Sequence, residues 1–365
     1  MFLAIRDIRF AKGRFALMGG VVALITLLLV MLSGLTAGLG NQSTSAIAAL
    51  PADRLVFGAP AGSSPEASFT ESEVTGAQVA AWSVREGVGT AEALGVSQGR
   101  LQALGDGGVP AGTANVAVFG AGSGSRLAPA PVAEGTVVVG DATAQDLDLA
   151  VGSRVAVGGT ELAVSAVVPE QWYSHTGVVW TTLGDWRKLA HLAGSDAVAT
   201  VAAVSFEDGA GVDVAAADRA AGTVSASREG SFQALGSYRS ENGSLLLMQA
   251  FLYGISALVI VAFLTVWTVQ RTRDIAVLKA MGGSSDYVLK DAMVQAAVVL
   301  VAGAAAGGTA GVLGGLLAAR AAPFLTTPQT TLLPVAGIVA LGLAGAALAV
   351  RGITRVDPLL ALGGN

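Results

Sequence analysis

The sequence predicts a membrane α-helical protein with four transmembrane helices and one α+β extracytoplasmic domain, inserted between helices 1 and 2. Two observations lead to this fold class. Of the 365 residues, 53% are hydrophobic and only 13% are charged, whereas a soluble domain carries roughly a quarter charged residues. The chain also contains four apolar runs of about 20 residues or more, the length that crosses ~30 Å of hydrocarbon.

The four apolar runs divide the chain into membrane and non-membrane parts. The predicted transmembrane helices cover residues 17–39, 244–268, 292–319 and 332–350. A short exposed loop at 320–331, which contains two prolines, joins the last two. The first run could alternatively be a cleavable signal peptide. We favour an uncleaved anchor because no A-x-A-like site ends the run, and residues 1–16 before it resemble an amphipathic helix.

Basic residues predict the orientation in the membrane. Residues 1–16, a segment at 269–291 and the tail at 351–365 together hold 10 of the 21 lysines and arginines. Because lysine and arginine concentrate on the cytoplasmic side, we expect both termini to be cytoplasmic and residues 40–243 to be extracytoplasmic. That outer segment carries a net charge of about −11, which disfavours binding to nucleic acid.

The outer segment combines strand and helix signals. A strand ending in a turn is expected at 54–60, and residues 66–82 mix helix-start residues with a helical run. Residues 135–170 predict a strand, a short helix, a strand, a Gly-Gly hairpin and a further strand. Residues 177–192 predict a strand that leads into a helix, and the GSGS sequence at 122–125 predicts a turn.

Several activities are excluded by missing residue types. The chain has no cysteine, so it has neither a disulfide framework nor a thiolate metal site. No G-x-x-x-x-G-K-[ST] sequence is present to hold a nucleotide, and no H-E-x-x-H sequence occurs. His175 and His191 have no neighbouring ligand set, so we expect surface or packing roles. We therefore expect no enzyme, no permanently bound cofactor and no metal, but a device driven by another protein.

A charged elbow follows the second apolar run. Its charged members are Arg271, Arg273, Asp274 and Lys279, and its apolar members Ile275, Leu278 and Met281 recur every three residues. Gly282 and Gly283 end this short predicted helix. The elbow could be a solvated loop that follows the positive-inside rule. An apolar stripe outside both lipid and core indicates instead a docking surface.

The stretch RTRDIAVLKAMGGSSDYVLKDAMVQAAVVLVAGAAAGG resembles the signature of MacB/FtsX-type ABC transporter permeases. The layout is similar as well: an amphipathic N-terminal helix, one span, a large outer domain and three further spans. The tail RVDPLLALGG also resembles the family's ending. The specific resemblance covers about residues 270–312, and Gly283 stands where the family usually has alanine.

This resemblance implies a permease subunit that works by mechanotransmission. Two copies would pair, and a separate ATPase subunit that binds ATP would dock on each elbow and move the spans as rigid helices. The residues expected to dock on the ATPase are Arg271, Arg273, Asp274, Ile275, Leu278, Lys279, Ala280, Met281 and Gly282.

A candidate ligand site lies near the outer end of the second span. Its expected members are Glu241, Tyr238, Arg239, Met248, Tyr253 and, from the first span, Met31. Tyrosine, methionine or a carboxylate can approach haem iron, and arginine can meet propionates. The chain also resembles the small haem-export permeases of Gram-positive bacteria, the HrtB-like branch. We expect haem as a transported substrate, with Glu241 as the first candidate ligand and Tyr238 as the second.

Other interpretations of this region stay open. Glu241 and Tyr238 could anchor a helix at the membrane interface. The substrate could be a lipid, a lipopeptide or an antimicrobial peptide, or the chain could control a cell-wall hydrolase as FtsX-like proteins do. A membrane sensor without transport is a further class.

Small residues mark the third span. Gly303, Gly307 and Gly311 recur every four positions, and such a face lets helix backbones approach closely in lipid. It could pack inside one subunit, or it could form a sliding or subunit interface.

Overall fold

The structure is a computed structural model that describes residues 12–105, 108–192, 196–270 and 284–351. The chain divides into two compact units, each described here by itself. The helical unit comprises Met1–Leu39 and Gly243–Asn365, and the inserted domain comprises Gly40–Asn242.

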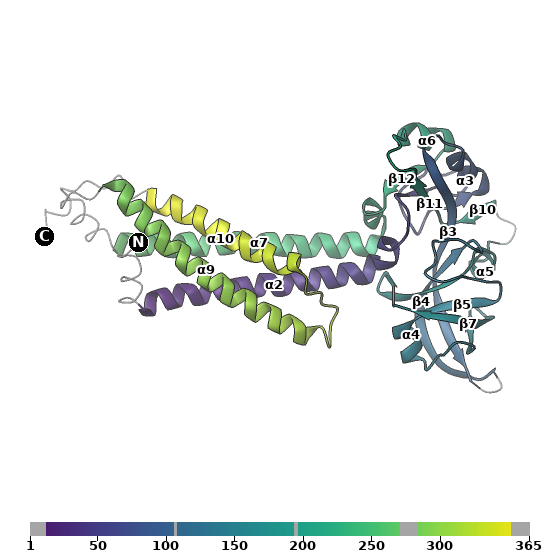
Figure 1. The fold of residues 1–365 in the computed structure, drawn as a ribbon, viewed down its shortest axis with the longest axis horizontal. Helices are drawn as coiled ribbons and strands as arrows, with labels where there is room; N and C mark the ends of the chain where they lie inside the picture. Colours follow the sequence, from purple (N-terminus) through teal and green to yellow (C-terminus); the bar gives the residue numbers. More distant parts are fainter. Residues whose placement is uncertain (1–11, 106–107, 193–195, 271–283, 352–365) are drawn as a thin grey trace. The chain divides into compact units, whose positions relative to one another are not determined.

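Four long helices build the helical unit. They are α2 (Lys12–Ala48), α7 (Gly236–Gln270), α9 (Ser285–Ala318) and α10 (Pro328–Arg351). Each is long and apolar enough to cross a membrane, so the four predicted spans are confirmed as helices. Their buried faces share one core, in which Val22 of α2, Ile260 of α7, Leu300 of α9 and Ile338 of α10 take part. The four helices run alongside one another (Figure 1).

The helices extend beyond the predicted apolar runs. Hydrophobicity marks only the part of a helix that lies in hydrocarbon, whereas backbone hydrogen bonding continues through polar residues on either side. Consequently α2 ends, and α7 begins, within the residues assigned to the inserted domain.

The loop predicted at 320–331 differs from expectation in two ways. Pro328 already begins α10, because a proline in the first helical turn loses no helix hydrogen bond. Phe324 and Pro323 pack closely on α2: a Cβ added at Gly34 would lie 2.2 Å from the Phe324 ring, and one added at Gly38 would lie 2.0 Å from the Pro323 carbonyl oxygen. The loop is therefore partly buried and not simply exposed.

The inserted domain is an α+β fold with one large sheet and one small one. Its strands are β1 (Arg54–Phe57), β2 (Val74–Thr75), β3 (Val88–Leu104), β4 (Pro110–Ala121), β5 (Thr136–Gly140), β6 (Arg154–Val157), β7 (Thr160–Val168), β8 (Trp172–Tyr173), β9 (Thr176–Thr182), β10 (Ala197–Ala199), β11 (Val201–Phe206) and β12 (Val224–Ser227). Its helices are α3 (Gly76–Ser83), α4 (Asp141–Asp146), α5 (Leu183–Leu189), α6 (Val214–Ala221) and the 3₁₀ helix η2 (Gly230–Ala234).

The long strand β3 joins two parts of the large sheet. The strand order is β12-β1-β11-β3-β4-β9-β5-β7-β6, and β3 pairs a second time, with β6. One half of β3 pairs with β11 from Leu94↔Val201, and the other half pairs with β6 from Leu101↔Val157. Six strands, β3, β4, β9, β5, β7 and β6, thus close into a ring. Closure removes exposed strand edges.

Most predicted elements of the inserted domain are confirmed. Residues 135–170 form β5, α4, β6, the Gly158-Gly159 turn and β7 in the expected order, and 177–192 contain β9 followed by α5. Residues 66–82, where start signals and a helical run were expected, contain the first seven residues of α3. Helix α3 begins only at Gly76, because Thr75 is its N-cap and forms a capping box with Gln78.

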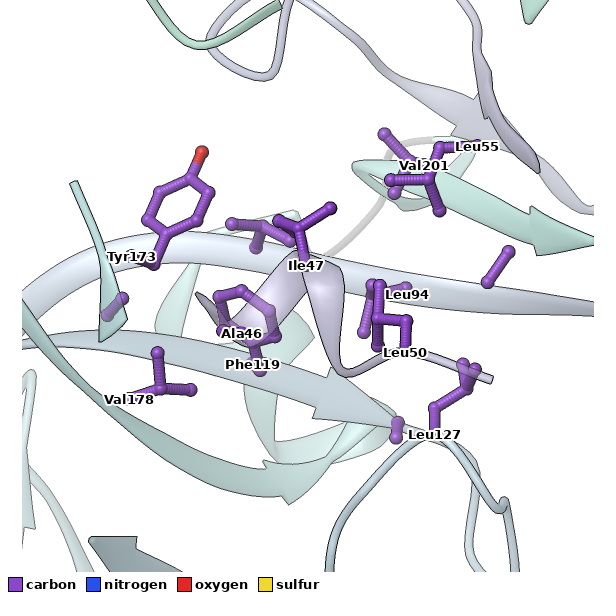
Figure 2. Packing of buried hydrophobic residues seen from close by; sticks show 14 of the residues in the cluster. Ala46, Ile47, Leu50, Leu55, Leu94, Phe119, Leu127, Tyr173, Val178 and Val201 are labelled. Atoms are coloured by element: carbon purple, nitrogen blue, oxygen red, sulfur yellow. The ribbon is translucent and has the colours of Figure 1, made fainter. Parts of the chain in front are cut away.

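The C-terminal end of α2 lies in the core of the inserted domain. Ile47 of α2 and Leu50, two residues after the helix, are fully buried in the same cluster as Leu94 of β3 and Phe119 of β4 (Figure 2). Burying a leucine or isoleucine side chain contributes roughly 1.5–3 kcal/mol. The end of α2 is thereby part of the domain's folded core and not a surface linker.

Candidate functional site

Glu241, the first candidate ligand, forms an ion-pair contact with a histidine. Its Oε2 lies 2.9 Å from Nε2 of His175, and Ser43 Oγ of α2 lies 3.1 Å from the same nitrogen. His175 follows β8, and Glu241 lies in the first turns of α7. The side chains of His175 and Glu241 are 31% and 40% exposed, so this contact remains accessible to solvent.

The turn that carries His175 is held by further hydrogen bonds. Ser174 and His175 connect β8 to β9, and we call these two residues the strap. Their backbone N–H groups donate to the carbonyl oxygens of Ser43 and Gln42 over 3.1 and 3.0 Å. The Ser174 hydroxyl lies 2.9 Å from that of Ser237 in α7. The strap therefore bonds both to the last part of α2 and to the first part of α7.

Both strap residues adopt a backbone conformation that side chains rarely take. The φ angle is 47° at Ser174 and 63° at His175. Two central residues with positive φ are characteristic of the type I′ turn that joins tight hairpins. Without glycine, such positions cost on the order of 1–3 kcal/mol each and persist only where surrounding contacts hold them. The bonds to α2 and α7 supply such contacts.

The contacts among Ser43, His175 and Glu241 differ from those that activate a catalytic serine. A serine–histidine–carboxylate relay needs the serine on one ring nitrogen and the carboxylate on the other. Here Ser43 and Glu241 both approach Nε2 of His175. Among the described residues no group of three or more histidine, cysteine, aspartate or glutamate side chains could hold a metal.

Tyr238 and Arg239 have different surroundings. Tyr238 packs against the domain core, with its ring 5.9 Å from the ring of Phe232 in an edge-on contact. The Arg239 side chain is exposed and forms no ion pair with any residue that the structure describes. Arg239 is therefore available to an anionic group, whereas the apolar face of Tyr238 is occupied by protein.

The three candidate residues in the helical unit, Met31, Met248 and Tyr253, also differ in their surroundings. A Cβ added at Gly314 of α9 would lie 3.3 Å from Met31 Sδ, so Met31 packs against α9. A Cβ added at Gly337 of α10 would lie 3.1 Å from the Tyr253 ring. Only Met248 has a large exposed fraction, 56%. Met31 and Tyr253 thus contribute to helix packing.

The expected docking residues lie outside the part of the chain that the structure describes. They are Arg271, Arg273, Asp274, Ile275, Leu278, Lys279, Ala280, Met281 and Gly282.

The small residues of α9 contact α2 of the same chain. A Cβ added at Gly303 would lie 2.7 Å from the carbonyl oxygen of Gly19, and one added at Gly307 would lie 2.1 Å from that of Ala23. Real Cβ atoms essentially never approach so closely. These glycines therefore let the backbones of α2 and α9 touch, which agrees with the expectation of close packing inside one subunit.

The part of the chain that contains α9 and α10 decides the family. Residues 246–358 match the family described as FtsX-like permease C-terminal. This part of the chain is that of an FtsX-like permease.

The relatives of this chain align with different shares of its length. An uncharacterized ABC transporter permease of Mycobacterium tuberculosis is 24% identical over 386 aligned residues, which cover 100% of this chain and 99% of that one. The permease HrtB of Staphylococcus epidermidis, named for hemin transport, is 28% identical over 131 residues. That match spans 36% of this chain and 37% of the relative's length.

Two solved structures share a limited likeness with the chain. The periplasmic region of MacB from Actinobacillus actinomycetemcomitans is 10% identical, with a TM-score of 0.34, and the match covers 49% of this chain and 90% of that one. The extracellular domain of the transporter YknZ from Gram-positive bacteria is 14% identical, with a TM-score of 0.30, and the match covers 43% of this chain and 84% of that one.

Sequence reasoning missed the role of His175. It lies 132 residues from Ser43 and 66 residues from Glu241 along the chain, and no spacing rule connects such positions. The one local signal was the short Trp172–Tyr173 strand before it, which is too brief to predict a hairpin.

Proposed function

We propose that this permease is the membrane subunit of an ABC efflux transporter that works by mechanotransmission. In this proposal two copies pair in the membrane, both termini are cytoplasmic, and a separate ATPase subunit docks on each elbow. The match of residues 246–358 to the FtsX-like permease family carries the proposal, because that segment includes the elbow, α9, α10 and most of α7.

Two features of the fold support the transmission of force. Helices α2 and α7 are each continuous, over 37 and 35 residues, and a helix without a break carries displacement along its axis. The strap then bonds to both helices. A shift of α2 against α7 therefore strains the strap and, through β8 and β9, the large sheet.

We further propose that the exported substrate is haem or a similar amphiphile. The support is the similarity to the HrtB permease named for hemin transport, over 131 residues. Glu241 and His175 are side chains that haem iron accepts as ligands, and the exposed Arg239 suits a propionate. The full-length relative from Mycobacterium tuberculosis names no substrate, so lipids, lipopeptides and antimicrobial peptides stay as alternatives, as does control of a cell-wall hydrolase.

A haem titration tests the substrate directly. Purified permease in nanodiscs is titrated with hemin, and binding is followed as a Soret band distinct from that of free hemin. We expect the wild type to bind hemin saturably. For Glu241→Ala we expect a shifted Soret band or an affinity for hemin that is at least tenfold lower, because a candidate ligand is removed. Glu66→Ala is the matched control, since Glu66 is an exposed carboxylate in a loop.

Two results would overturn the haem assignment. One is the absence of any saturable spectral change in the wild type. The other is equal hemin binding by the wild type and by each of the single variants Glu241→Ala, His175→Ala and Tyr238→Phe. In either case the ATPase of the reconstituted complex is assayed with lipids and lipopeptides, and stimulation by one of them identifies the alternative class.

A further inference from the structure

A cavity lies inside the inserted domain, beside the strap. Its volume is about 410 Å³, which falls within the usual range for small-molecule sites. Residues from several separate segments line it: Phe69, Gln98 of β3, Tyr173 of β8, Ser174 of the strap, Ala234 of η2 and Ser237 of α7 are among them. All of these residues belong to the same compact unit.

Tyr173 presents a polar group to this cavity. Only 5% of the residue is exposed, and its ring is held between edge-on contacts to Phe69 at 5.8 Å and Phe119 at 5.4 Å. The hydroxyl is directed away from Phe119 and the buried core (Figure 2). It forms no hydrogen bond with any of the residues that the structure describes, so it can donate to a ligand in the cavity.

Burial also keeps this hydroxyl protonated. It raises the pKa of Tyr173 above the ordinary value for tyrosine, because desolvation disfavours the phenolate. Tyr173 is therefore a hydrogen-bond donor at any physiological pH and lacks an acceptor.

The rest of the lining determines what kind of acceptor fits. None of the described residues that line the cavity is charged, so an ionic ligand would lose its hydration without gaining a counter-charge. Ser174 and Ser237 share one hydrogen bond between their hydroxyls, which leaves one O–H of the pair free to donate. Phe69 and Leu235 add an apolar wall.

From these contacts we infer that the cavity is a binding site for an uncharged ligand that places a carbonyl or amide oxygen on the Tyr173 hydroxyl and an apolar or aromatic group against Phe69. Haem does not meet this description, because its propionates would find no cation in the lining. The site is thus additional to the proposed export function and does not depend on which amphiphile is exported.

The position of the cavity would let a bound ligand affect the contacts between the strap and α7. Ser174 belongs to the strap, and Ser237 lies in the first turn of α7. A ligand seated on both residues stabilises the hydrogen bonds that tie β8 to α7. Occupancy should therefore slow hydrogen exchange in the strap as well as at the cavity wall.

A neutral aromatic amide tests the site. The probe is N-acetyl-L-phenylalaninamide, which carries two amide carbonyls and one ring, and the matched charged probe is N-acetyl-L-phenylalanine. Binding to the full-length permease in nanodiscs is measured by ligand-observed NMR, and the bound region is located by hydrogen exchange. We expect saturable binding of the neutral probe with a Kd of about 1 mM or below, protection of residues 173–176 and 234–237, and at least tenfold weaker binding of the carboxylate.

Variants separate this cavity from other sites. Tyr173→Phe keeps the ring contacts and removes only the donor, so we expect about three- to tenfold weaker binding, as for the loss of one neutral hydrogen bond. Ala234→Phe fills the cavity and should abolish binding, while thermal unfolding verifies that the domain still folds. Tyr287→Phe removes a tyrosine hydroxyl from α9 and should bind like the wild type.

Three results would refute the inference. They are no saturable binding of the neutral probe, unchanged affinity in both Tyr173→Phe and Ala234→Phe, and protection confined to residues outside the cavity. Haem binding by the same preparation is measured in parallel, so a failure here is distinguishable from a failure of the proposed export function.

Discussion

At the scale of single residues, Asp185 illustrates how a buried charge is accommodated in the inserted domain. Its carboxylate is only 3% exposed. It accepts hydrogen bonds from Gly135 N–H at 2.8 Å, the Thr182 hydroxyl at 2.9 Å and Lys188 Nζ at 2.9 Å. Burial by itself raises the pKa of this carboxyl, but the three hydrogen bonds outweigh burial and the pKa is lowered from its ordinary value. Folding therefore stabilises the charged form of the Asp185 carboxyl.

We predict that Asp185→Asn lowers the free energy of unfolding by about 2 kcal/mol at pH 7, since charge-assisted hydrogen bonds to a buried group are lost. A carboxyl whose pKa is depressed in the folded state stabilises above its unfolded pKa of about 3.9. This contribution disappears as the pH falls through the lower, folded value. The difference in the free energy of unfolding between Asp185→Asn and the wild type should therefore have its full value at pH 7. It should vanish only in acid, below about pH 4.

Urea unfolding of the full-length permease, followed by tryptophan fluorescence, measures this effect. Trp186, which is buried beside Asp185 in α5, reports on the same helix. Asp146→Asn serves as the control because Asp146 is exposed, and it should change the unfolding free energy by less than 0.5 kcal/mol or so. An equally stable Asp185→Asn at pH 7 would show that the hydrogen bonds do not stabilise the fold.

At the scale of elements, the seam between α2 and α9 depends on residues without side chains. Gly303 and Gly307 bring the two backbones into contact, and Gly311 faces Val30 of α2, where an added Cβ would lie 2.8 Å from Cγ1. Because lipid offers no hydrophobic gain for helix association, close packing is a main source of stability here. The repeat of glycines predicted a close contact, but the repeat alone did not identify the contacting helix.

We predict that Gly307→Leu separates α2 from α9 and destabilises the helical unit by roughly 1–3 kcal/mol, as overpacking typically does. The helix backbone of α2 cannot move aside as a flexible side chain would, since the contact is to the Ala23 carbonyl. SDS-induced unfolding in mixed micelles measures the loss. Gly254→Leu in α7 is the matched control, because nothing lies within 4 Å of a Cβ added there.

If Gly307→Leu were as stable as Gly254→Leu, the seam would not be a packing contact of the folded permease.

At the scale of the whole molecule, the proposed function assigns ATP hydrolysis to a separate ATPase subunit that docks on the elbow. The elbow is the only predicted docking surface that lies between two spans of the FtsX-like segment. We predict that Arg273→Glu or Leu278→Asp reduces copurification of the ATPase subunit and permease-stimulated ATP hydrolysis by at least tenfold. Charge reversal or a buried carboxylate removes complementarity at an interface core.

Membrane insertion and thermal stability should remain those of the wild type in both variants. Arg320→Glu, a charge reversal at an exposed position after α9, should leave ATPase binding and turnover unchanged. Normal complex formation by Arg273→Glu and Leu278→Asp would contradict the docking role of the elbow.

The parts of this protein that could be predicted from sequence are those that depend on neighbouring residues. Four apolar runs determined the four helices, and alternation with Gly-Gly punctuation determined β5 to β7, because hydrophobic burial and turn chemistry act over a few residues. Strand β3 escaped prediction since it contains several glycines and alanines and pairs, besides its neighbour β4, with β11 and β6, which are distant in sequence. Its strand conformation follows from that pairing and not from local preference.

By itself, the sequence determined the membrane class and the number of spans, both of which are local properties of composition and spacing, and it predicted the charged elbow. Only the tertiary structure decided which side chains meet. It joined Glu241 to His175, placed Met31 and Tyr253 in helix packing, and placed Tyr173 at a cavity, where its hydroxyl has no partner among the described residues. Those outcomes depend on the path of the chain, which brings together residues that are tens to more than a hundred positions apart.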